Sequence, residues 1–567
     1  MESAIGAKSR VGEGEEITTR LKNVRSDIVA GIVVSLVSLP LSSGIAIASG
    51  VPPIYGLISA IIAGLVFPFI GGAYVTIAGP AAGLAPAIAA VMVAFGGVGD
   101  ADHLGAGYPL LLVVIFLVGI LQIILSLLKM ARFAAIIPVS VVEGMLAAIG
   151  LLIVVKQLPM FFGYTGSIHA HEFVDFLRET PTYASAMTVP VFAVSMLTLV
   201  VLFVLGNIKG VKLLRVVPPQ LIAVIFGVAM GQLFHLSAVG SHFLISLPKD
   251  PFHGLHMPQF GSLLARHDLW YAAILGVITL TMIDGVESLA TAMAVDRIDP
   301  LHRKSKPNRV LLAMGVCNIA SSCVGGLTII PGGVKSKVNV ASGARTLWAN
   351  FTNAICLIVY LLVGREWINM IPKGVLASVL IYTGWKMCEP LIWKHMAHIG
   401  KEQLGIFTLT VAATLATDLL WGIAIGVGAK FVLNMVLYRS AMASSLPDGA
   451  RLPLVRNAFD FFRNPVCKRE LRGTEYHVYL DKPAVCFNSM KLGQELDKVP
   501  AEATSVYVHL NGQVGVVDHT TCENLMHVVQ QFSHSNVPVE IVGLDRMRPL
   551  SHYPACTRLA TPAIAVA

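Results

Sequence analysis

The residues with the clearest chemical potential lie in one apolar stretch, Thr281 to Asp296, which reads TMIDGVESLATAMAVD. Glu287 and Thr291 are four residues apart and would share one face of a helix, with Asp284 one turn before Glu287. A carboxylate in such a segment is costly, so it either binds a cation or has a structural role bonded to the backbone. We favour a cation, Na+ or a proton, bound by Glu287, Thr291 and Asp284.

Two further apolar segments are short and interrupted by glycine and proline. The segment from Tyr74 to Gly96 contains AGPAAG, and the segment from Thr328 to Gly343 contains PGG followed by a lysine. The N-terminus of a half-helix carries free N–H groups and a partial positive charge, so two such ends facing each other make an anion site. A cation at the carboxylates would then enter together with the anion. The predicted anion-binding residues are Ala81, Ala82, Gly83, Gly332, Gly333 and Lys335.

Membrane-spanning helices are needed to position these residues. The chain of 567 residues is 55% hydrophobic and 13% charged, with a mean hydropathy of +0.73, whereas a soluble domain carries about 25% charged residues. Together with the two interrupted segments, the apolar runs make about 14 elements. The uninterrupted runs begin near Asp27, Ile54, Tyr108, Ala134, Ala186, Pro218, Asp268, Asn308, Leu347, Pro372, Gln403 and Leu420.

The two interrupted segments are each third in a run of seven elements, as expected for two halves of inverted topology with a transport site between them. The alternative is that Gly and Pro are simply common in membrane helices. The net charge of +8 follows the positive-inside rule rather than indicating nucleic-acid binding, and it predicts that both termini are cytoplasmic. The basic residues concerned are Lys129, Arg132, Lys209, Lys212, Arg215, Arg297, Arg303, Lys304, Lys306, Arg309, Lys386, Lys394 and Lys401.

Composition divides the chain into four parts. We expect a cytoplasmic segment at 1–26, a transmembrane domain at 27–443, a linker at 444–473 and a small α/β domain at 474–567. Within the last part, residues 506–510 and 539–543 are predicted strands, and residues 525–532 a predicted helix.

The motifs together resemble the SulP family of anion transporters, also called sulfate permeases. The matching stretches are Ser38-Leu39-Pro40, residues 50–57 (GVPPIYGL), Gly79-Pro80, residues 136–141 (IIPVSV), residues 287–292 (ESLATA), residues 338–340 (VNV) and residues 343–346 (GART). The C-terminal part resembles a STAS domain, the module that commonly ends these transporters.

The resemblance implies seven-plus-seven inverted repeats divided into a core and a gate, with the anion between the third and tenth half-helices, and usually a homodimer. It also implies a sodium site at Glu287 and Thr291, as in bicarbonate-transporting members. The basic residue of the tenth segment is usually Arg; Lys335 cannot offer the same bidentate contact but could attract the anion or pair with Glu287. In anti-sigma-factor antagonists with this module, a hydroxyl near Asp518 is phosphorylated, but for Thr520 we favour a helix N-cap role.

The sequence thus predicts a multi-pass protein of the cell (inner) membrane that transports a small inorganic anion by alternating access. Bicarbonate is favoured over sulfate, with Na+ or H+ as the coupling ion. The alternatives are a sulfate or dicarboxylate transporter or exchanger of the same family, a nucleobase permease, and a non-transporting scaffold for the STAS domain.

We expect no enzymatic activity and no cofactor besides the coupling ion. The expected partners are the anion, the bilayer, a second copy of the chain and a cytoplasmic partner of the STAS-like domain, without nucleic acid. The histidines lack the spacing of a metal site and are expected at interfaces; they include His169, His171, His235, His267, His395 and His398.

Overall fold

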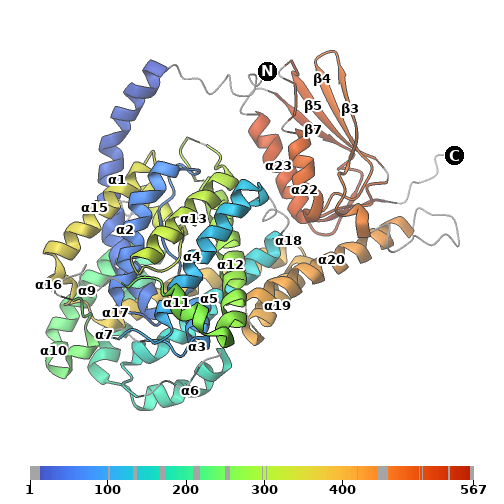
Figure 1. Cartoon of the computed structure of the whole chain (residues 1–567). Helices are drawn as coiled ribbons and strands as arrows, with labels where there is room; N and C mark the ends of the chain where they lie inside the picture. The colour runs from blue at the N-terminus through green and yellow to red at the C-terminus, as the bar shows by residue number, and fades with distance from the viewer. Residues whose placement is uncertain are drawn as a thin grey trace. The chain divides into compact units, whose positions relative to one another are not determined.

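The chain folds into two compact units (Figure 1). The C-terminal unit comprises Met1–Glu13, Arg132–Met145 and Glu389–Ala567, and the helical unit comprises Gly14–Ala131 and Leu146–Cys388. The computed structural model describes residues 13–99, 103–131, 137–166, 168, 170, 173–208, 218–248, 256–296, 298–301, 303–417, 419–443, 458–496, 498–500, 502–511, 513–533 and 537–561. The basic residues Arg132, Lys209, Lys212, Arg215 and Arg297, and the histidines His169 and His171, lie outside the described residues.

Helices make up nearly all of the helical unit. Proline occupies the first or second position of α2, α4, α7, α9 and α13, where its missing N–H costs no hydrogen bond. The elements are α1 (Glu13–Ala48), α2 (Pro53–Ile70), β1 (Ala78–Pro80), α3 (Ala85–Ala94), α4 (Tyr108–Leu127), α5 (Val139–Phe162), α6 (Phe173–Ser185), α7 (Val189–Asn207), α9 (Pro219–Leu233), α10 (Leu236–Val239), α11 (Phe260–Ala265), α12 (Trp270–Asp296), α13 (Pro307–Cys323), β2 (Ile329–Pro331), α14 (Gly333–Ala341), α15 (Trp348–Val363), α16 (Arg365–Ile368) and α17 (Lys373–Cys388).

Among the described residues, eight helical stretches are long and apolar enough to cross a membrane. They are Asn23–Ala48, Pro53–Ile70, Tyr108–Leu127, Val139–Phe162, Val189–Asn207, His267–Asp296, Lys373–Ile399 and Leu419–Met442. Three shorter apolar helices accompany them: Ala85–Ala94, Pro219–Leu233 and Trp348–Val363. The predicted fold class, a helical polytopic membrane protein with a small α/β region, is confirmed, whereas the total of 14 spans stays a prediction.

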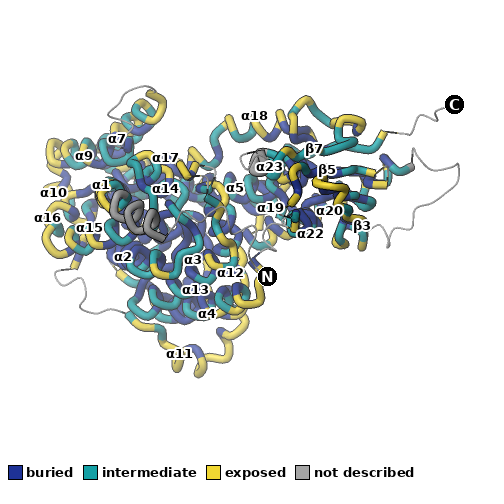
Figure 2. Tube along the Cα trace, turned by 90° about the horizontal axis from the view of Figure 1, so that it is seen from above, coloured by how far each residue is buried: buried dark blue, intermediate teal, exposed yellow. Residues whose placement is uncertain are grey.

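Large apolar side chains are exposed along several of these helices, as a lipid-facing surface requires. Leu197, Val200 and Val204 on α7 are examples, and exposed positions alternate with buried ones along the helices (Figure 2). The apolar exterior and the polar residues buried inside are the reverse of what a soluble bundle would show.

Glycines allow α4 and α13 to pack closely. A Cβ built on Gly119 would lie 2.6 Å from the carbonyl oxygen of Gly315, and one built on Gly315 would lie 2.7 Å from the carbonyl oxygen of Gly119. The two backbones therefore touch at a point where neither helix tolerates a side chain, as is common between membrane helices.

The C-terminal unit joins the last helices to a small α/β region. It contains α18 (Pro390–Ile399), α19 (Lys401–Ala416), α20 (Leu419–Ala443), α22 (Cys486–Leu496) and α23 (His519–Ser533). Its sheet has the strand order β3-β4-β5-β7, antiparallel between β3 and β4 and parallel for the other two pairs. The strands are β3 (Val466–Arg472), β4 (Glu475–Leu480), β5 (Ser505–Leu510), β6 (Val516–Val517), β7 (Val539–Val542), β8 (Arg548–Pro549) and β9 (Arg558–Leu559).

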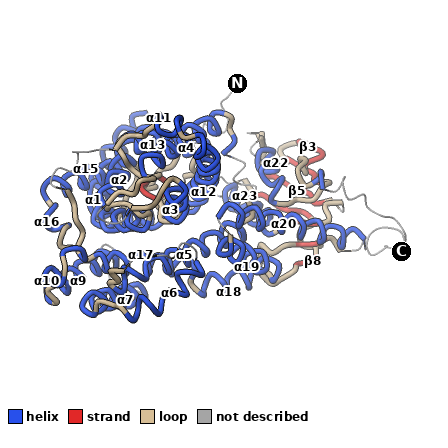
Figure 3. The backbone as a smooth tube through the Cα atoms, turned by 60° about the horizontal axis from the view of Figure 1, so that its bottom comes forward, coloured by secondary structure: helices blue, strands red, loops and turns tan. Residues whose placement is uncertain are grey.

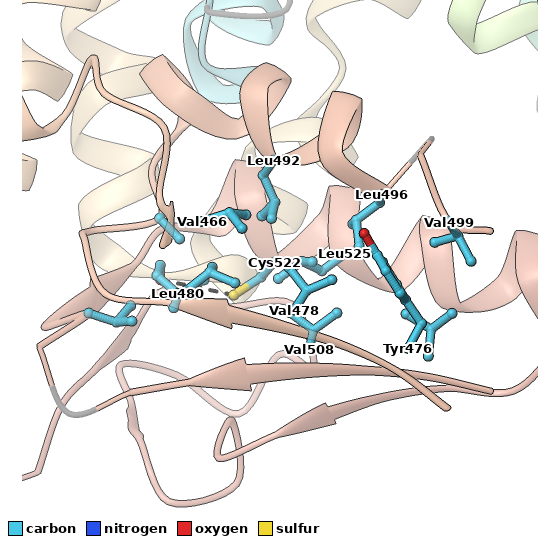
Figure 4. Packing of buried hydrophobic residues seen from close by; sticks show 14 of the residues in the cluster. Val466, Tyr476, Val478, Leu480, Leu492, Leu496, Val499, Val508, Cys522 and Leu525 are labelled. Carbon is cyan, nitrogen blue, oxygen red and sulfur yellow. Dashed lines mark hydrogen bonds between the residues drawn. The ribbon is translucent and has the colours of Figure 1, made fainter. Parts of the chain in front are cut away.

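Alternating apolar residues of the strands pack against the helices. Val478, Val508 and Leu480 meet Leu492 and Leu525 in this core (Figure 4). Most strands lie in the α/β region, while β1 and β2 lie among helices (Figure 3).

The strands and helix predicted at residues 506–510, 539–543 and 525–532 are confirmed as β5, β7 and part of α23. Strand β3 lies inside the range 444–473 that the sequence analysis assigned to a linker. The N-cap role expected for Thr520 is wrong. Asp518 caps α23, accepting a hydrogen bond from the N–H of Thr521 at 2.9 Å, and Thr520 Oγ1 accepts one from the N–H of Val139 at 3.5 Å.

We expect Gly119→Val to destabilise the helical unit, because the added side chain must push α13 away from α4. Overpacking of this kind costs about 1–3 kcal/mol. The melting temperature of the purified protein in detergent measures it. Gly405→Val is the control, because a Cβ on Gly405 meets nothing within 4 Å. Equal melting temperatures for both variants would show that the α4–α13 contact is not tight.

Candidate functional site

Two short strands cross inside the helical unit. β1 and β2 pair antiparallel, with Ala78 opposite Pro331, Gly79 opposite Ile330 and Pro80 opposite Ile329, and all six residues are buried. Side chains complete the pairing of the flanking backbone: the N–H of Ile77 donates to Ser336 Oγ at 3.0 Å, that of Ala78 donates to Asn350 Oδ1 at 3.0 Å, and Asn339 Nδ2 donates to the carbonyl of Val75 at 2.8 Å. Groups of the protein itself therefore satisfy these backbone atoms of the broken segments.

Each strand leads into a short helix. α3 has 10 residues and α14 has nine, so each extends only about 14–15 Å, half of a hydrocarbon core. Of the predicted anion-binding residues, Ala81, Ala82 and Gly83 form the turn before α3, while Gly332 is the N-cap of α14 and Gly333 its first residue. The antiparallel strands send the two helices off in opposite directions, so both helix N-termini face the crossing.

One face of α12 contacts both N-termini. A Cβ built on Gly83 would lie 2.4 Å from Glu287 Oε2, so the carboxylate rests directly against the turn before α3. A Cβ built on Gly333 would lie 3.7 Å from Thr291 Cγ2 at the start of α14. Because Glu287 and Thr291 are separated by about 6 Å along the helix, the two N-termini lie close to each other. The predicted pair on α12 is thus placed beside the predicted anion-binding turns.

The carboxylate of Glu287 is buried, with 7% of the residue exposed. Its Oε2 has no hydrogen-bond partner among the residues that the structure describes. A buried carboxylate oxygen without a donor is costly, so it fits a site whose proton or cation comes from outside the chain.

Asp284 is fully buried one turn earlier and has neutral partners. Its Oδ1 accepts from Ser288 Oγ at 3.0 Å and its Oδ2 from Asn318 Nδ2 at 3.0 Å. Asn318 Nδ2 also donates to Gln122 Oε1 at 2.9 Å, and Asn318 Oδ1 accepts from the N–H of Ile329 at 2.7 Å. Asp284 is therefore bonded to side chains, and through Asn318 it is connected to β2 rather than to either helix N-terminus.

Lys335 points from α14 toward α1. Lys335 is 2% exposed, and its ammonium donates a hydrogen bond to Ser42 Oγ at 2.9 Å. A Cβ built on Gly79 would lie 2.6 Å from Lys335 Nζ, so the ammonium also rests against β1. The pairing of Lys335 with Glu287 that the sequence analysis considered is therefore not formed. The lysine adds positive charge at the strand crossing instead.

The sequence analysis missed several residues of this site, notably Ser42, Asn318, Ser336 and Asn350. Their signal was available, because polar side chains in apolar segments are uncommon, but the family motif around Ser38-Leu39-Pro40 drew no attention to Ser42. Two further hydroxyls of α1, Ser38 Oγ and Ser43 Oγ, are buried without a hydrogen-bond partner among the described residues.

Within the described ranges no group of three or more His, Cys, Asp or Glu side chains could hold a metal ion. His395 and His398 instead lie near the ring of Tyr553, at 5.9 Å between ring centroids in each case. The site consists of two helix N-termini, one ammonium, two carboxylates and several hydroxyls, a set suited to binding an anion together with a small cation.

Comparison with known proteins gives matches to both the sequence and the fold. The model of the sulfate permease family matches residues 24–410. YvdB of Bacillus subtilis is 26% identical over 416 residues, covering 73% of this chain and 74% of that protein. The bicarbonate transporter BicA of Picosynechococcus is 25% identical over 423 residues, covering 74% of this chain and 72% of that protein.

Solved structures share the fold. The transmembrane domain of a cyanobacterial bicarbonate transporter BicA has a TM-score of 0.61 at 22% identity, covering 71% of this chain and 97% of that one. The overall structure of SLC26A9 has a TM-score of 0.63 at 14% identity, covering 92% of this chain and 84% of that one. The second match extends beyond the membrane helices into the C-terminal α/β region.

We expect Gly83→Ala to abolish anion binding, because the new methyl group would displace the Glu287 carboxylate and distort the turn before α3. The measurement is the rise in melting temperature that bicarbonate or sulfate produces in the purified protein. Gly285→Ala is the matched control, because a Cβ there meets nothing within 4 Å. An unchanged anion-induced shift in Gly83→Ala would place the anion elsewhere.

Proposed function

We propose that the chain is a secondary active transporter of a small inorganic anion. The premise is that it belongs to the sulfate permease family. The family consists of transporters, not enzymes. The observation that carries the proposal is the placement of both half-helix N-termini against one face of α12, at Glu287 and Thr291. Helix N-termini bind anions through free N–H groups and their dipole, and Lys335 adds a full positive charge.

The coupling ion is a small cation bound at Glu287. In the structure Oε2 of Glu287 lacks a hydrogen-bond partner within the described part of the chain, and Asp284 accepts only from neutral groups. Two buried carboxylates without cations are unfavourable beside an incoming anion, so Na+ or a proton must neutralise charge as the anion binds. Thr291 offers a hydroxyl one turn along the same face. The site with both ions bound carries less net charge than the site with the anion alone. We therefore expect the anion and the cation to enter together.

Bicarbonate is the favoured substrate and sulfate the second. An ammonium at Lys335 supplies one charge without the bidentate geometry of Arg, which suits a monovalent anion better than a dianion. The named relatives include a bicarbonate transporter, although identity is only 25%. A sulfate or dicarboxylate transporter or exchanger of the same family is the alternative. A membrane scaffold that does not transport is the second alternative.

Alternating access would expose the site first on one side of the membrane and then on the other. The proposed setting is a multi-pass protein of the cell (inner) membrane with both termini cytoplasmic, acting as a homodimer. Its α/β region, of STAS type, lies in the cytoplasm and binds a cytoplasmic partner. The two interrupted segments have the same secondary structure, a three-residue strand followed by a short helix. This likeness supports the seven-plus-seven inverted repeat.

We expect Glu287→Gln to lose cation-driven uptake, because the neutral amide cannot bind Na+ or carry a proton. Uptake of labelled bicarbonate and labelled sulfate into proteoliposomes is measured with and without a sodium gradient, and again with a pH gradient. Glu366→Gln is the control, since Glu366 is an exposed carboxylate of α16. Gradient-driven uptake by Glu287→Gln at the native rate would remove this carboxylate from the coupling.

We expect Lys335→Arg to shift the preference toward sulfate by roughly tenfold, because the guanidinium can donate two parallel hydrogen bonds to an oxyanion. Lys335→Met should abolish the uptake of both anions. The ratio of initial rates for the two anions measures the preference. The same ratio in native protein and Lys335→Arg would show that this side chain does not contact the anion.

A further inference from the structure

A second buried lysine lies in the last membrane helix. Lys430, near the middle of α20, is 0% exposed, and its Nζ has no hydrogen-bond partner among the described residues. Its partner in charge is Asp518 of the α/β region, also 0% exposed, with Nζ and Oδ2 3.9 Å apart. Two opposite charges are thus buried together between a membrane helix and the α/β region of the same compact unit.

The Asp518 carboxylate accepts hydrogen bonds from three helices, α20, α22 and α23. Its Oδ2 accepts from the N–H of Cys486 at 2.9 Å and from Asn434 Nδ2 at 3.2 Å, while Oδ1 accepts from the N–H of Thr521 at 2.9 Å. The carboxylate therefore caps the N-termini of both α22 and α23 and also bonds to α20. Burial alone would raise the pKa of Asp518, but Lys430 and these N–H groups outweigh it and hold the pKa below its usual value, so the group is anionic.

An apolar contact surrounds the charges. Tyr438 of α20 is buried against Phe461, Phe487 and Val516, and Phe431 packs on Phe461 with ring centroids 5.8 Å apart. Gly515, with φ of +63°, allows close approach, because a Cβ there would lie 2.5 Å from the ring of Tyr438. Lys430 and Asn434 are one turn apart on this same face of α20. Apolar packing gives the contact area, and the polar groups determine its register.

We propose that the Lys430–Asp518 pair fastens the α/β region to the last membrane helix, and that transport requires this attachment. In so apolar a contact neither charge can be left without the other, so α20 and the α/β region move as one body. Any displacement of α20 during transport must then carry the α/β region with it or break the pair. The fastening stands on these contacts alone, whereas its effect on transport rests on the proposed function.

The test is a double-mutant cycle on the full chain with Lys430→Met, Asp518→Asn and the double variant. We expect Lys430→Met to increase amide hydrogen exchange in residues 427–442 and 484–489, leaving β4 and β5 protected, and to lower the initial rate of anion uptake by at least about fivefold. The double variant should be impaired less than the sum of the two single variants, because it leaves no buried charge unpaired. Lys468→Met is the control, since Lys468 pairs with Glu470 on the surface at 3.1 Å.

Each outcome decides one part of the proposal. Native exchange rates in Lys430→Met, or additive effects in the cycle, would overturn the fastening. Increased exchange with unchanged uptake would overturn the requirement for transport and leave the fastening intact. If the native chain takes up neither anion while exchange responds as expected, the proposed function fails and the fastening is still supported.

Discussion

The site depends on the pairing of two three-residue strands inside a domain that is otherwise helical. In hydrocarbon each unpaired backbone N–H or C=O is costly, so a membrane helix can be broken only where other groups satisfy the break. Here β1 and β2 satisfy each other, and Ser336, Asn350 and Asn339 complete the flanking residues. The starts of α3 and α14 lie beside this pairing, and the first N–H groups of a helix are the kind of group that an anion can use.

The arrangement around this crossing balances charge with very few ionisable side chains. Glycine at position 83 lets α12 come close enough for Glu287 to reach the turn before α3, and Thr291 of the same helix lies near the start of α14. Asp284, one turn away, is connected by hydrogen bonds through Asn318 to Ile329 of β2. A change in the charge of Asp284 would therefore alter the hydrogen bonding of β2. In the proposed function, binding of an anion, neutralisation of a carboxylate and the position of β2 would thus be physically connected.

Sequence alone could identify Glu287, Thr291 and the two interrupted segments, because spacing defines a helix face and Gly–Pro clusters mark a break. It could not show that Lys335 contacts Ser42, since the two are 293 residues apart and periodicity does not say which faces meet. The same limit hid the link from Asp284 to Asn318 and the packing of α20 on the α/β region. Strand β3 was not predicted because most of residues 468–472 are charged and exposed, as in a linker, and only pairing with β4 makes the segment a strand.

Lys335 and Lys430, two of the buried lysines, show how the same side chain can serve opposite purposes. Lys430 of α20 and Lys335 of α14 are both almost fully buried. Lys430 has the carboxylate of Asp518 as a permanent counter-ion, so the chain itself completes the charge and the lysine can fasten one part to another. Lys335 contacts the neutral hydroxyl of Ser42, and no described carboxylate lies within ion-pair distance of its ammonium. Because a buried ammonium without a counter-ion is unfavourable, an anion bound at the proposed site would stabilise Lys335, whereas Lys430 needs no such ligand.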